Sequence, residues 1–463
     1  MSSEKKEFPK PLSLLKMVGP SFLILAMGLG SGEIILWPYL VANYGLGVAW
    51  GAVLGISLQF FINMEIERYA LVKGESVFVG LAKIFKWTPY WFIFSTFLGF
   101  GLPGIVAASA NIFGYLLGSL EFRSIAVFML IAMGCLLTFG KTVYETMERV
   151  TKLLLMVCVP FIFGLVVIMA KKTDWLALVN GVFGIGEGYR FLPAGISLAT
   201  FLGAFAYSGA GGNLNLTQSI YIKEKGYGMG KYSQKIAGLF RSHKNETVKL
   251  SGEEFEINAE SISNFKQWWR KINIEHFLVF WVIGLLSMLL LMLLSYVTTY
   301  GKGSNLQGIS FVLNEGGVLI GQLGIWGKLF LLVLSVLLFQ TQLGIMDSTS
   351  RIMGESLAIL RIDSGKESTI SLGRFYFGFV WAQIVFGCLV FAFNIYEPRG
   401  LIVLGAVINA FAMLVHTLLV YILNKKSLPK TFAPSLVRKI AIWIALIFFG
   451  FFGLVNLWFA FGV

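Results

Sequence analysis

Two long apolar segments of this sequence are each interrupted near the middle, and these interruptions constrain the fold more than any other feature. The first is Ala26-Met-Gly-Leu-Gly-Ser-Gly-Glu33, in which Gly28, Gly30 and Gly32 fall within five residues. The second is Tyr207-Ser-Gly-Ala-Gly-Gly-Asn213. Backbone groups freed from a helix at membrane depth must line a protein cavity or bind something. Paired interruptions of this kind are typical of the binding site of a transporter built from repeats.

The composition is that of a membrane protein that crosses the bilayer many times. Of 463 residues, 57% are hydrophobic and only 13% are charged, which excludes an ordinary soluble domain. Eleven apolar segments are long enough to span a bilayer: 17–42, 46–70, 90–117, 123–140, 149–170, 192–222, 273–299, 324–348, 374–393, 399–424 and 437–461. The interrupted segments are the first and the sixth. We therefore predict one all-α transmembrane domain over 1–463, with two inverted five-helix repeats and an added eleventh helix.

The basic residues predict the orientation of the chain. The loops on the side of the N-terminus hold 30 of the 37 Lys and Arg residues, which places the N-terminus in the cytoplasm and the C-terminus outside the inner (plasma) membrane. The charge of +13 is then a topology signal, and we expect no nucleic-acid partner. The longest polar stretch, 223–271, becomes a cytoplasmic loop that ends in an interfacial helix. Glu65, Glu67 and Arg68 are expected to face the cytoplasmic vestibule or the lipid headgroups, and His276 to lie in or beside the loop.

The first interruption predicts a substrate site made largely of backbone. Exposed N–H groups at the start of the second half-helix, together with its dipole, favour an anion, and glycine lets a small ligand approach the backbone closely. Close helix packing is the alternative role for these glycines. The residues expected to bind the substrate are Gly30, Ser31, Gly32, Glu33, Tyr207, Ser208, Gly209, Gly211, Gly212 and Asn213. The Glu33 carboxylate could bind a cation, carry a coupling proton or cap the half-helix.

The eighth apolar segment ends in a run of hard oxygen ligands. Asp347, Ser348 and Thr349, with backbone carbonyls near Met27, are suited to Na⁺ as a coupling ion. The alternative is that the hydroxyls bond back to the helix and that Asp347 pairs with Arg351 at the cytoplasmic edge. No nucleophile–base arrangement, phosphate-binding loop or transition-metal cluster is present in the sequence. We therefore expect neither an enzyme nor a cofactor, and the bilayer and a small inorganic ion as the partners.

Beyond these local features, the chain resembles the Nramp family of metal-ion transporters. Gly19-Pro-Ser-Phe-Leu23 is similar to the family's opening motif, 141–155 to its connection between the fourth and fifth spans, and 340–354 to its Ser/Thr-rich eighth span. The resemblance covers spans one to ten in order. It implies the LeuT-type fold and transport by alternating access.

The metal-binding motifs of that family are altered here. The Asp-Pro-Gly-Asn of its first span is replaced by Gly30-Ser-Gly-Glu33, and the Met-Pro-His-Asn of its sixth span by Ala210-Gly-Gly-Asn213. A soft transition metal would lose nearly all of the side chains that select it. The altered motifs resemble a branch of Nramp-related bacterial proteins that is associated with bicarbonate. Gly-Ser-Gly also resembles the first-span motif of amino-acid transporters with this fold.

The leading hypothesis is therefore a secondary transporter of a small anion, most simply bicarbonate, driven by Na⁺. One alternative is a transporter of a hard divalent cation such as Mg²⁺ or Mn²⁺, bound by Glu33, Asn213 and carbonyls. A further alternative is a transporter of amino acids or other organic solutes, which needs a roomier site.

Overall fold

The computed structural model describes residues 5–17, 19–118, 121–139, 143–233, 250–302, 309–363, 371–394 and 398–461. Within these ranges the chain is helical, and its β pairing consists of two isolated bridges, Lys6 with Phe255 and Ile185 with Arg190. Ten of the described helical segments are long and apolar enough to cross a membrane. The interrupted segment of 198–225 brings the number of spans to eleven, as the sequence predicts.

Eleven spanning elements follow one another along the chain. They are α2–η1–α3 (Pro20–Gly28, Ser31–Leu36, Trp37–Tyr44), α4 (Ala49–Lys73), α6–α7 (Thr88–Phe100, Gly104–Leu116), α8 (Phe122–Phe139), α9 (Val143–Met169), α11–η3–α12 (Leu198–Ala206, Gly212–Leu216, Thr217–Lys225), η5–α14 (Phe277–Ile283, Gly284–Thr299), α16 (Ile325–Asp363), α17 (Leu372–Ala392), α18 (Pro398–Ser427) and α19 (Leu436–Phe461). Shorter elements connect them: α1 (Leu14–Met17), η2 (Leu46–Val48), α5 (Val77–Ile84), α10 (Lys172–Val182), η4 (Gly228–Tyr232), α13 (Ala259–His276), α15 (Ser310–Leu323) and η6 (Lys430–Phe432).

Two elements differ from the sequence prediction. The third span is broken between Phe100 and Gly104, because Pro103 cannot donate a backbone hydrogen bond and glycines flank it. The eighth span, predicted to end at residue 348, continues as α16 to Asp363. Its polar residues beyond 346 stay helical because their side chains find partners inside the protein. The stretch predicted as an interfacial helix is helical, as part of α13, while residues 234–249 of the same loop lie outside the described ranges.

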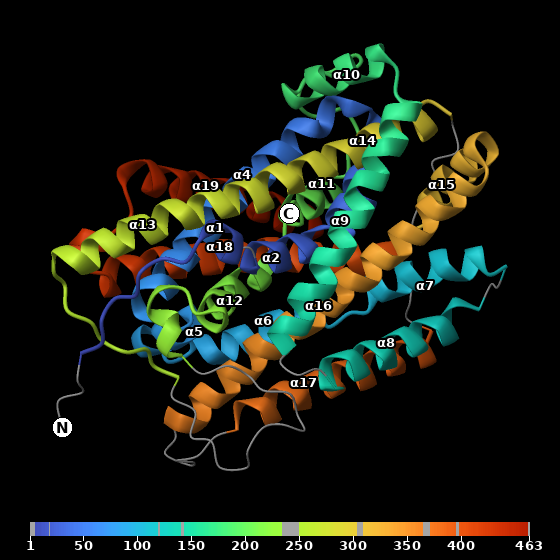
Figure 1. The fold of residues 1–463 in the computed structure, drawn as a ribbon. Helices are drawn as coiled ribbons and strands as arrows, with labels where there is room; N and C mark the ends of the chain where they lie inside the picture. The colour runs from blue at the N-terminus through green and yellow to red at the C-terminus, as the bar shows by residue number, and fades with distance from the viewer. Residues whose placement is uncertain are drawn as a thin grey trace.

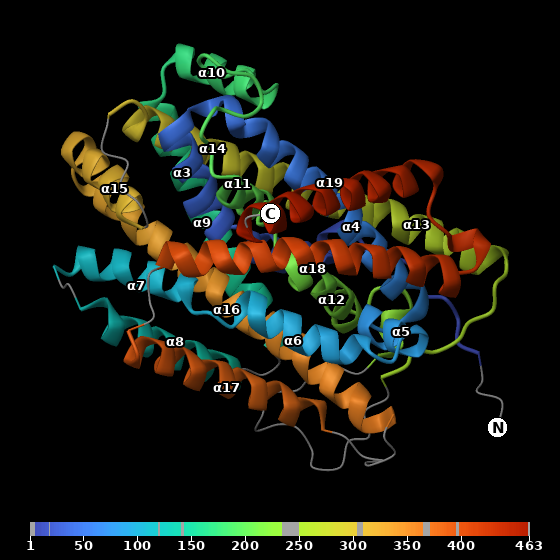
Figure 2. The same ribbon diagram turned by 180° about the vertical axis from the view of Figure 1, so that it is seen from behind.

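The helices form a bundle around the two interrupted spans. The N-terminal segment and α13 lie at one end of the bundle, which we call the N-terminal side, and α10 and α15 lie at the other (Figures 1 and 2). The helices α8 and α17 run side by side along one flank. In an apolar 18-residue stretch of the first span 94% is buried within the protein, whereas in the corresponding stretch of α19 only 22% is buried. The interrupted helices are therefore central, and the added eleventh helix is peripheral.

Candidate functional site

The break in the first span is held open by a neighbouring helix. Helix α2 ends at Gly28, and the chain turns through Leu29 and Gly30 before the π-helix η1 begins. The Thr341 hydroxyl on α16 contacts the carbonyl oxygens of Ala26 and Leu29, at 2.9 and 3.1 Å. These carbonyls would otherwise lack a partner at the end of a helix inside the membrane. Short π-helical turns are frequent at functional sites.

The break in the sixth span is bridged by a single side chain of α4. The Gln59 amide donates to the carbonyl oxygen of Ala206 at 2.9 Å and accepts from the N–H of Gly211 at 3.2 Å. Gly209, Gly211 and Gly212 all have positive φ, at 144°, 74° and 50°, a conformation that other residues adopt at a cost. The irregular turn is thus built by glycine and satisfied by Gln59.

The two breaks touch each other backbone to backbone. A Cβ atom added to Gly28 would lie 2.7 Å from the carbonyl carbon of Gly209, and one added to Gly32 would lie 2.1 Å from the carbonyl oxygen of Tyr207. A Cβ on Gly30 would lie 2.3 Å from the Thr341 methyl group. Close helix packing, the alternative role predicted for these glycines, is therefore present here, and the substrate-binding role stays a prediction.

A cavity of about 10 Å³ lies beside this contact, which is room for roughly one water molecule. Its lining residues are Gly99, Phe100, Leu102, Gly104, Ile105, Tyr207, Gln342, Ile345 and Gly405. The Tyr207 hydroxyl oxygen accepts from Asn409 Nδ2 at 2.9 Å. Because that bond uses an oxygen lone pair, the phenolic hydrogen is left for another acceptor. The break in the third span contributes Leu102 and Gly104 to this wall.

The other predicted substrate residues lie in different environments. The Ser208 hydroxyl accepts from Trp37 Nε1 at 2.9 Å and donates to the Ala204 carbonyl at 3.0 Å, so it joins the two interrupted spans. Asn213 Nδ2 donates to the hydroxyls of Ser95 and Thr96 on α6, while its Oδ1 has no partner among the described residues. The side chain of Ser31 lies outside the described part of the chain.

Glu33 is the least satisfied of the predicted residues. It is fully buried on η1, and neither carboxyl oxygen has a hydrogen-bond partner within the described residues. It does not line the cavity beside Tyr207. A carboxyl group in this state must be neutral or must meet a ligand that the protein alone does not supply.

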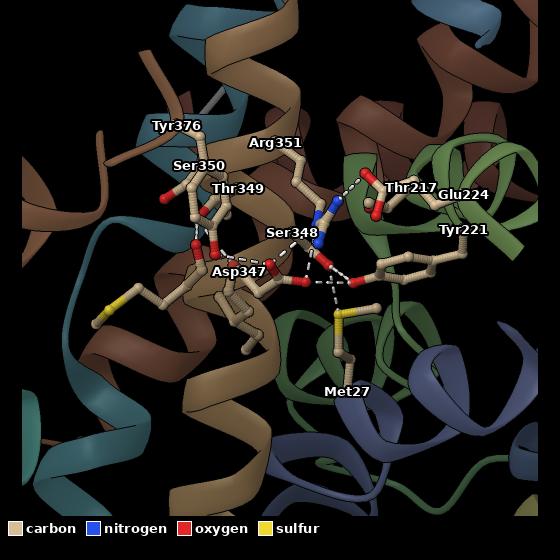
Figure 3. A network of polar contacts seen from close by, with 12 residues as sticks. Met27, Thr217, Tyr221, Glu224, Asp347, Ser348, Thr349, Ser350, Arg351 and Tyr376 are labelled. Carbon is tan, nitrogen blue, oxygen red and sulfur yellow. Dashed lines mark hydrogen bonds and ion pairs between the residues drawn. The ribbon is translucent and has the colours of Figure 1, made fainter. Parts of the chain in front are cut away.

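Asp347 belongs to a buried ion network (Figure 3). Its carboxylate accepts from Arg351 Nε at 2.9 and 3.0 Å, from the Tyr376 hydroxyl at 2.7 Å and from the Tyr221 hydroxyl at 3.1 Å. Arg351 also donates to Glu224 on α12. All of these side chains are buried. The network joins α16 to α12 and α17, and satisfied partners are what make buried charges tolerable.

The four residues predicted to bind Na⁺ come together only in part. Met27 and Ser348 meet, with the Ser348 hydroxyl 2.9 Å from the Met27 sulfur, whereas the Thr349 hydroxyl contacts the Ile345 carbonyl oxygen and Gln383 Oε1. The guanidinium of Arg351 stands where the Asp347 carboxylate would hold a cation. The described geometry therefore matches the alternative pairing and does not fit Na⁺ at this position. Asp347 is fully buried within the protein, on a helix that continues to Asp363.

The charged residues at the end of α4 are also inside the protein. Glu65, Glu67 and Arg68 are at most 4% exposed, which corrects the expectation that they face a vestibule. Arg68 donates to Glu65 at 2.9 Å and to the Phe432 carbonyl at 3.2 Å. His276, expected beside the loop, is fully buried. Polar residues at the end of an apolar segment give the same sequence pattern whether they face water or one another.

Sequence reasoning missed three residues that build the centre. Gln59, Thr341 and Asn409 come from α4, α16 and α18, and each bonds to a break or to Tyr207. A polar residue in the middle of an apolar span is a signal for each of them, but its partner cannot be read from the sequence. Within the described residues, no group of three or more His, Cys, Asp or Glu side chains is placed to hold a metal ion.

The architecture and the paired breaks define the class of fold: the LeuT-type fold of secondary transporters. No protein-family model matches the chain, and no curated protein matches it in sequence. Solved structures do match it. A variant of the manganese transporter of Eremococcus coleocola is 14% identical with a TM-score of 0.70, covering 97% of this chain and 88% of that one. The same transporter bound to an aromatic bis-isothiourea compound is 13% identical with a TM-score of 0.70, covering 98% and 90%.

More distant members of the same architecture also match. MhsT in complex with L-phenylalanine is 14% identical with a TM-score of 0.54, covering 97% of this chain and all of that one. Mhp1, a nucleobase-cation-symport-1 family transporter, is 12% identical with a TM-score of 0.50, covering 95% and 91%. At these identities the likeness establishes the LeuT-type fold. It leaves the substrate to be argued from the site.

Proposed function

We propose that this protein is a secondary transporter that carries a small inorganic ion by alternating access. The observation that carries the proposal is the backbone contact between the two breaks, Gly28 with Gly209 and Gly32 with Tyr207, beside a cavity of about 10 Å³. The cavity holds about one water molecule, so the site must widen to admit even a bicarbonate ion, and it must widen much more for an amino acid or other organic solute. The fold and the resemblance to the Nramp family both support transport, and the likeness to the solved manganese transporter supports a distant relation to that family.

An anion is the leading substrate, with bicarbonate as the simplest candidate. The Tyr207 hydroxyl keeps its hydrogen for a ligand. The first turn of a helix also offers N–H groups without an acceptor inside the helix, although the N–H of Ile34 bonds to the Gly30 carbonyl at 2.8 Å. Donors and the positive end of a helix dipole together favour a small oxyanion. The soft ligands that would select a transition metal are replaced by Ala210 and glycines.

The Tyr207 hydroxyl gives the sharpest test of the anion. Purified protein in proteoliposomes is assayed for uptake of labelled bicarbonate, comparing wild type with Tyr207→Phe and with the control Tyr115→Phe, whose side chain is 48% exposed. We expect Tyr207→Phe to raise KM about tenfold, since one hydrogen bond to a charged group contributes about 1.5–3 kcal/mol. Equal KM values for all three proteins would remove Tyr207 from the site.

A hard divalent cation is the second candidate, and Glu33 is the observation that favours it. Its two unpartnered oxygens are suitable ligands for Mg²⁺ or Mn²⁺, and Asn213 Oδ1 is unpartnered as well. This candidate predicts that wild type binds Mg²⁺ or Mn²⁺ in calorimetry and that Glu33→Gln does not. If neither protein releases heat with either ion, the cation hypothesis fails.

Orientation and coupling complete the proposal. The excess of Lys and Arg assigns the N-terminal side to the cytoplasm of a plasma membrane. Na⁺ remains the proposed coupling ion, and its position is not supported at Asp347, where Arg351 already neutralises the carboxylate. Uptake measured with and without an inward Na⁺ gradient tests the coupling separately from its site.

A further inference from the structure

A second polar cluster lies on the N-terminal side of the breaks, where four elements meet. It contains Ser21 of α2, Glu67 of α4, Gln218 of α12, and Glu275 and His276 at the junction of α13 and η5. None of the five is more than 5% exposed. Two of the elements, α2 and α12, are the half-helices on the N-terminal side of the interrupted spans. Movement of either half-helix would take the cluster apart.

Hydrogen bonds connect all five residues. The Ser21 hydroxyl donates to Glu275 Oε2 at 2.5 Å and lies 2.8 Å from His276 Nδ1. His276 Nδ1 is also 3.2 Å from Glu67 Oε1, which accepts from Gln218 Nε2 at 2.6 Å. Since the one hydroxyl hydrogen of Ser21 goes to Glu275, Nδ1 carries a hydrogen that faces Ser21 Oγ and Glu67.

The imidazole is held firmly in this position. The ring stacks on Phe280 with centroids 4.7 Å apart and on Phe60 with centroids 5.5 Å apart. The π-helix η5 begins at the next residue. Such turns are frequent at functional sites.

The basic groups that face the cluster make their direct ion pairs with acids outside it, and they share those acids, since Glu65 also pairs with Arg68. Arg438 faces Glu67 and His276, but it pairs with Glu65 at 3.5 Å. Lys152 and Lys225 face Glu275, and both pair with Glu148.

The remaining groups that face the cluster are neutral, namely the phenols of Tyr144 and Tyr227. Glu67 and Glu275 are joined through His276 and Ser21, and within the described residues neither carboxyl group has a Lys or Arg in direct contact. Burial without a direct cation favours the neutral, protonated form of a carboxyl group, so the cluster is suited to binding a proton. Among the described residues, Glu67 Oε2, Glu275 Oε1 and His276 Nε2 have no hydrogen-bond partner.

We propose that these five residues form a proton-binding site that keeps the N-terminal-side gate closed. A proton from the solution on that side binds to the carboxyl pair as α2 and α12 close over it. When the half-helices move apart, Ser21 and Gln218 leave, water reaches the carboxyl groups and the proton returns to the solution. Opening is therefore favoured at high pH and closure at low pH. The inference goes beyond the proposed function and does not depend on which ion is carried.

The test measures gate opening without any transported substrate. Ile220 of α12, which is 2% exposed, is replaced by cysteine in a background with Cys135, Cys158 and Cys388 changed to alanine. The rate of alkylation by a maleimide is followed from about pH 6 to pH 8.5 in three proteins: this background, the background with Glu67→Gln and Glu275→Gln, and the background with Glu75→Gln. Glu75 pairs with Lys83 at the same end of the bundle and serves as the matched control.

At each pH the rate of the background is divided by that of the variant, which cancels the thiol's own titration. We expect this ratio to rise at least about tenfold over the range for the double variant, because a single proton shifts a population about tenfold per pH unit. For Glu75→Gln the ratio stays near one. If size-exclusion chromatography shows that the double variant is not folded, the single Glu67→Gln variant is tested in its place, and we expect its rate ratio to rise with pH as well. A flat ratio for the folded variant overturns the proposal.

Discussion

The substitution Gly32→Ala tests the contact between the two breaks, on which the account of the site rests. The added Cβ would lie 2.1 Å from the Tyr207 carbonyl oxygen, whereas ordinary contact begins at 3.4 Å. The neighbouring atoms are backbone, so the two interrupted helices must separate by about 1.3 Å, the difference between these distances. Forcing a methyl group into a packed core costs about 1–3 kcal/mol.

The consequence for transport is larger than the consequence for stability. A separation of about an ångström can reduce the rate of a positioned reaction about 100-fold, and we expect a similar loss of uptake at equal reconstituted amounts. The matched control is Gly164→Ala in the middle of α9, where an added Cβ meets nothing within 4 Å. It should leave uptake unchanged and stabilise the helix by up to about 1 kcal/mol.

Both variants are measured by uptake into proteoliposomes and by thermal unfolding in detergent. The expected result is a low melting temperature and loss of uptake for Gly32→Ala, with normal values for Gly164→Ala. Wild-type uptake by Gly32→Ala, at wild-type melting temperature, would show that the breaks are not in contact and would refute the reasoning.

Three further substitutions test other parts of the structure. Arg351→Gln leaves Asp347 and Glu224 buried without their cation and should cost about 3–5 kcal/mol of unfolding free energy in denaturant titrations; a loss below about 1 kcal/mol would mean that the network is hydrated. Thr341→Val removes the hydroxyl that contacts the carbonyl oxygens of Ala26 and Leu29, and it should lower the unfolding free energy by about 1–3 kcal/mol in the same titrations. An unchanged unfolding free energy would show that these carbonyls have another partner. Burial raises the pKa of Glu315, on α15 outside the spans, from 4.5 to about 8. The stabilisation of the fold by the protonated carboxyl group is therefore fully present below pH 4.5 and is lost as pH rises through about 8. The melting temperature of wild type should fall over that window, whereas that of Glu315→Gln should not. Parallel melting curves for the two proteins across this pH range would contradict the prediction.

The spans and the two breaks could be predicted because their signals are local. An apolar run long enough to cross a bilayer and three glycines between residues 28 and 32 are visible without knowing any partner. The backbone of the first break is where the sequence places it, between Gly28 and Ser31. Gly101, Pro103 and Gly104 are a local signal for the break in the third span. The break was not predicted, because the apolar run continues through these residues.

The partners across the bundle could not be predicted, because they depend on which helices become neighbours. Gln59 and Thr341 are ordinary polar residues until α4 and α16 pack against the breaks. Asp347 was expected at a membrane edge since the apolar run ends there. The helix continues because Arg351, Tyr221 and Tyr376 satisfy the carboxylate. The five-residue cluster on the N-terminal side could not be predicted for the same reason, since Glu67 and His276 lie far apart in the sequence and meet only in the fold.

Uptake of labelled bicarbonate into proteoliposomes tests the central claim most directly. Wild type, Gly32→Ala and empty liposomes are compared, with Mg²⁺ and Mn²⁺ offered as competitors. The account predicts saturable uptake by wild type that neither metal ion inhibits, and background values for the variant and the empty liposomes. Bicarbonate flux equal to that of empty liposomes, from folded protein that accumulates Mg²⁺ or Mn²⁺, would contradict the account and assign the centre to a cation at Glu33.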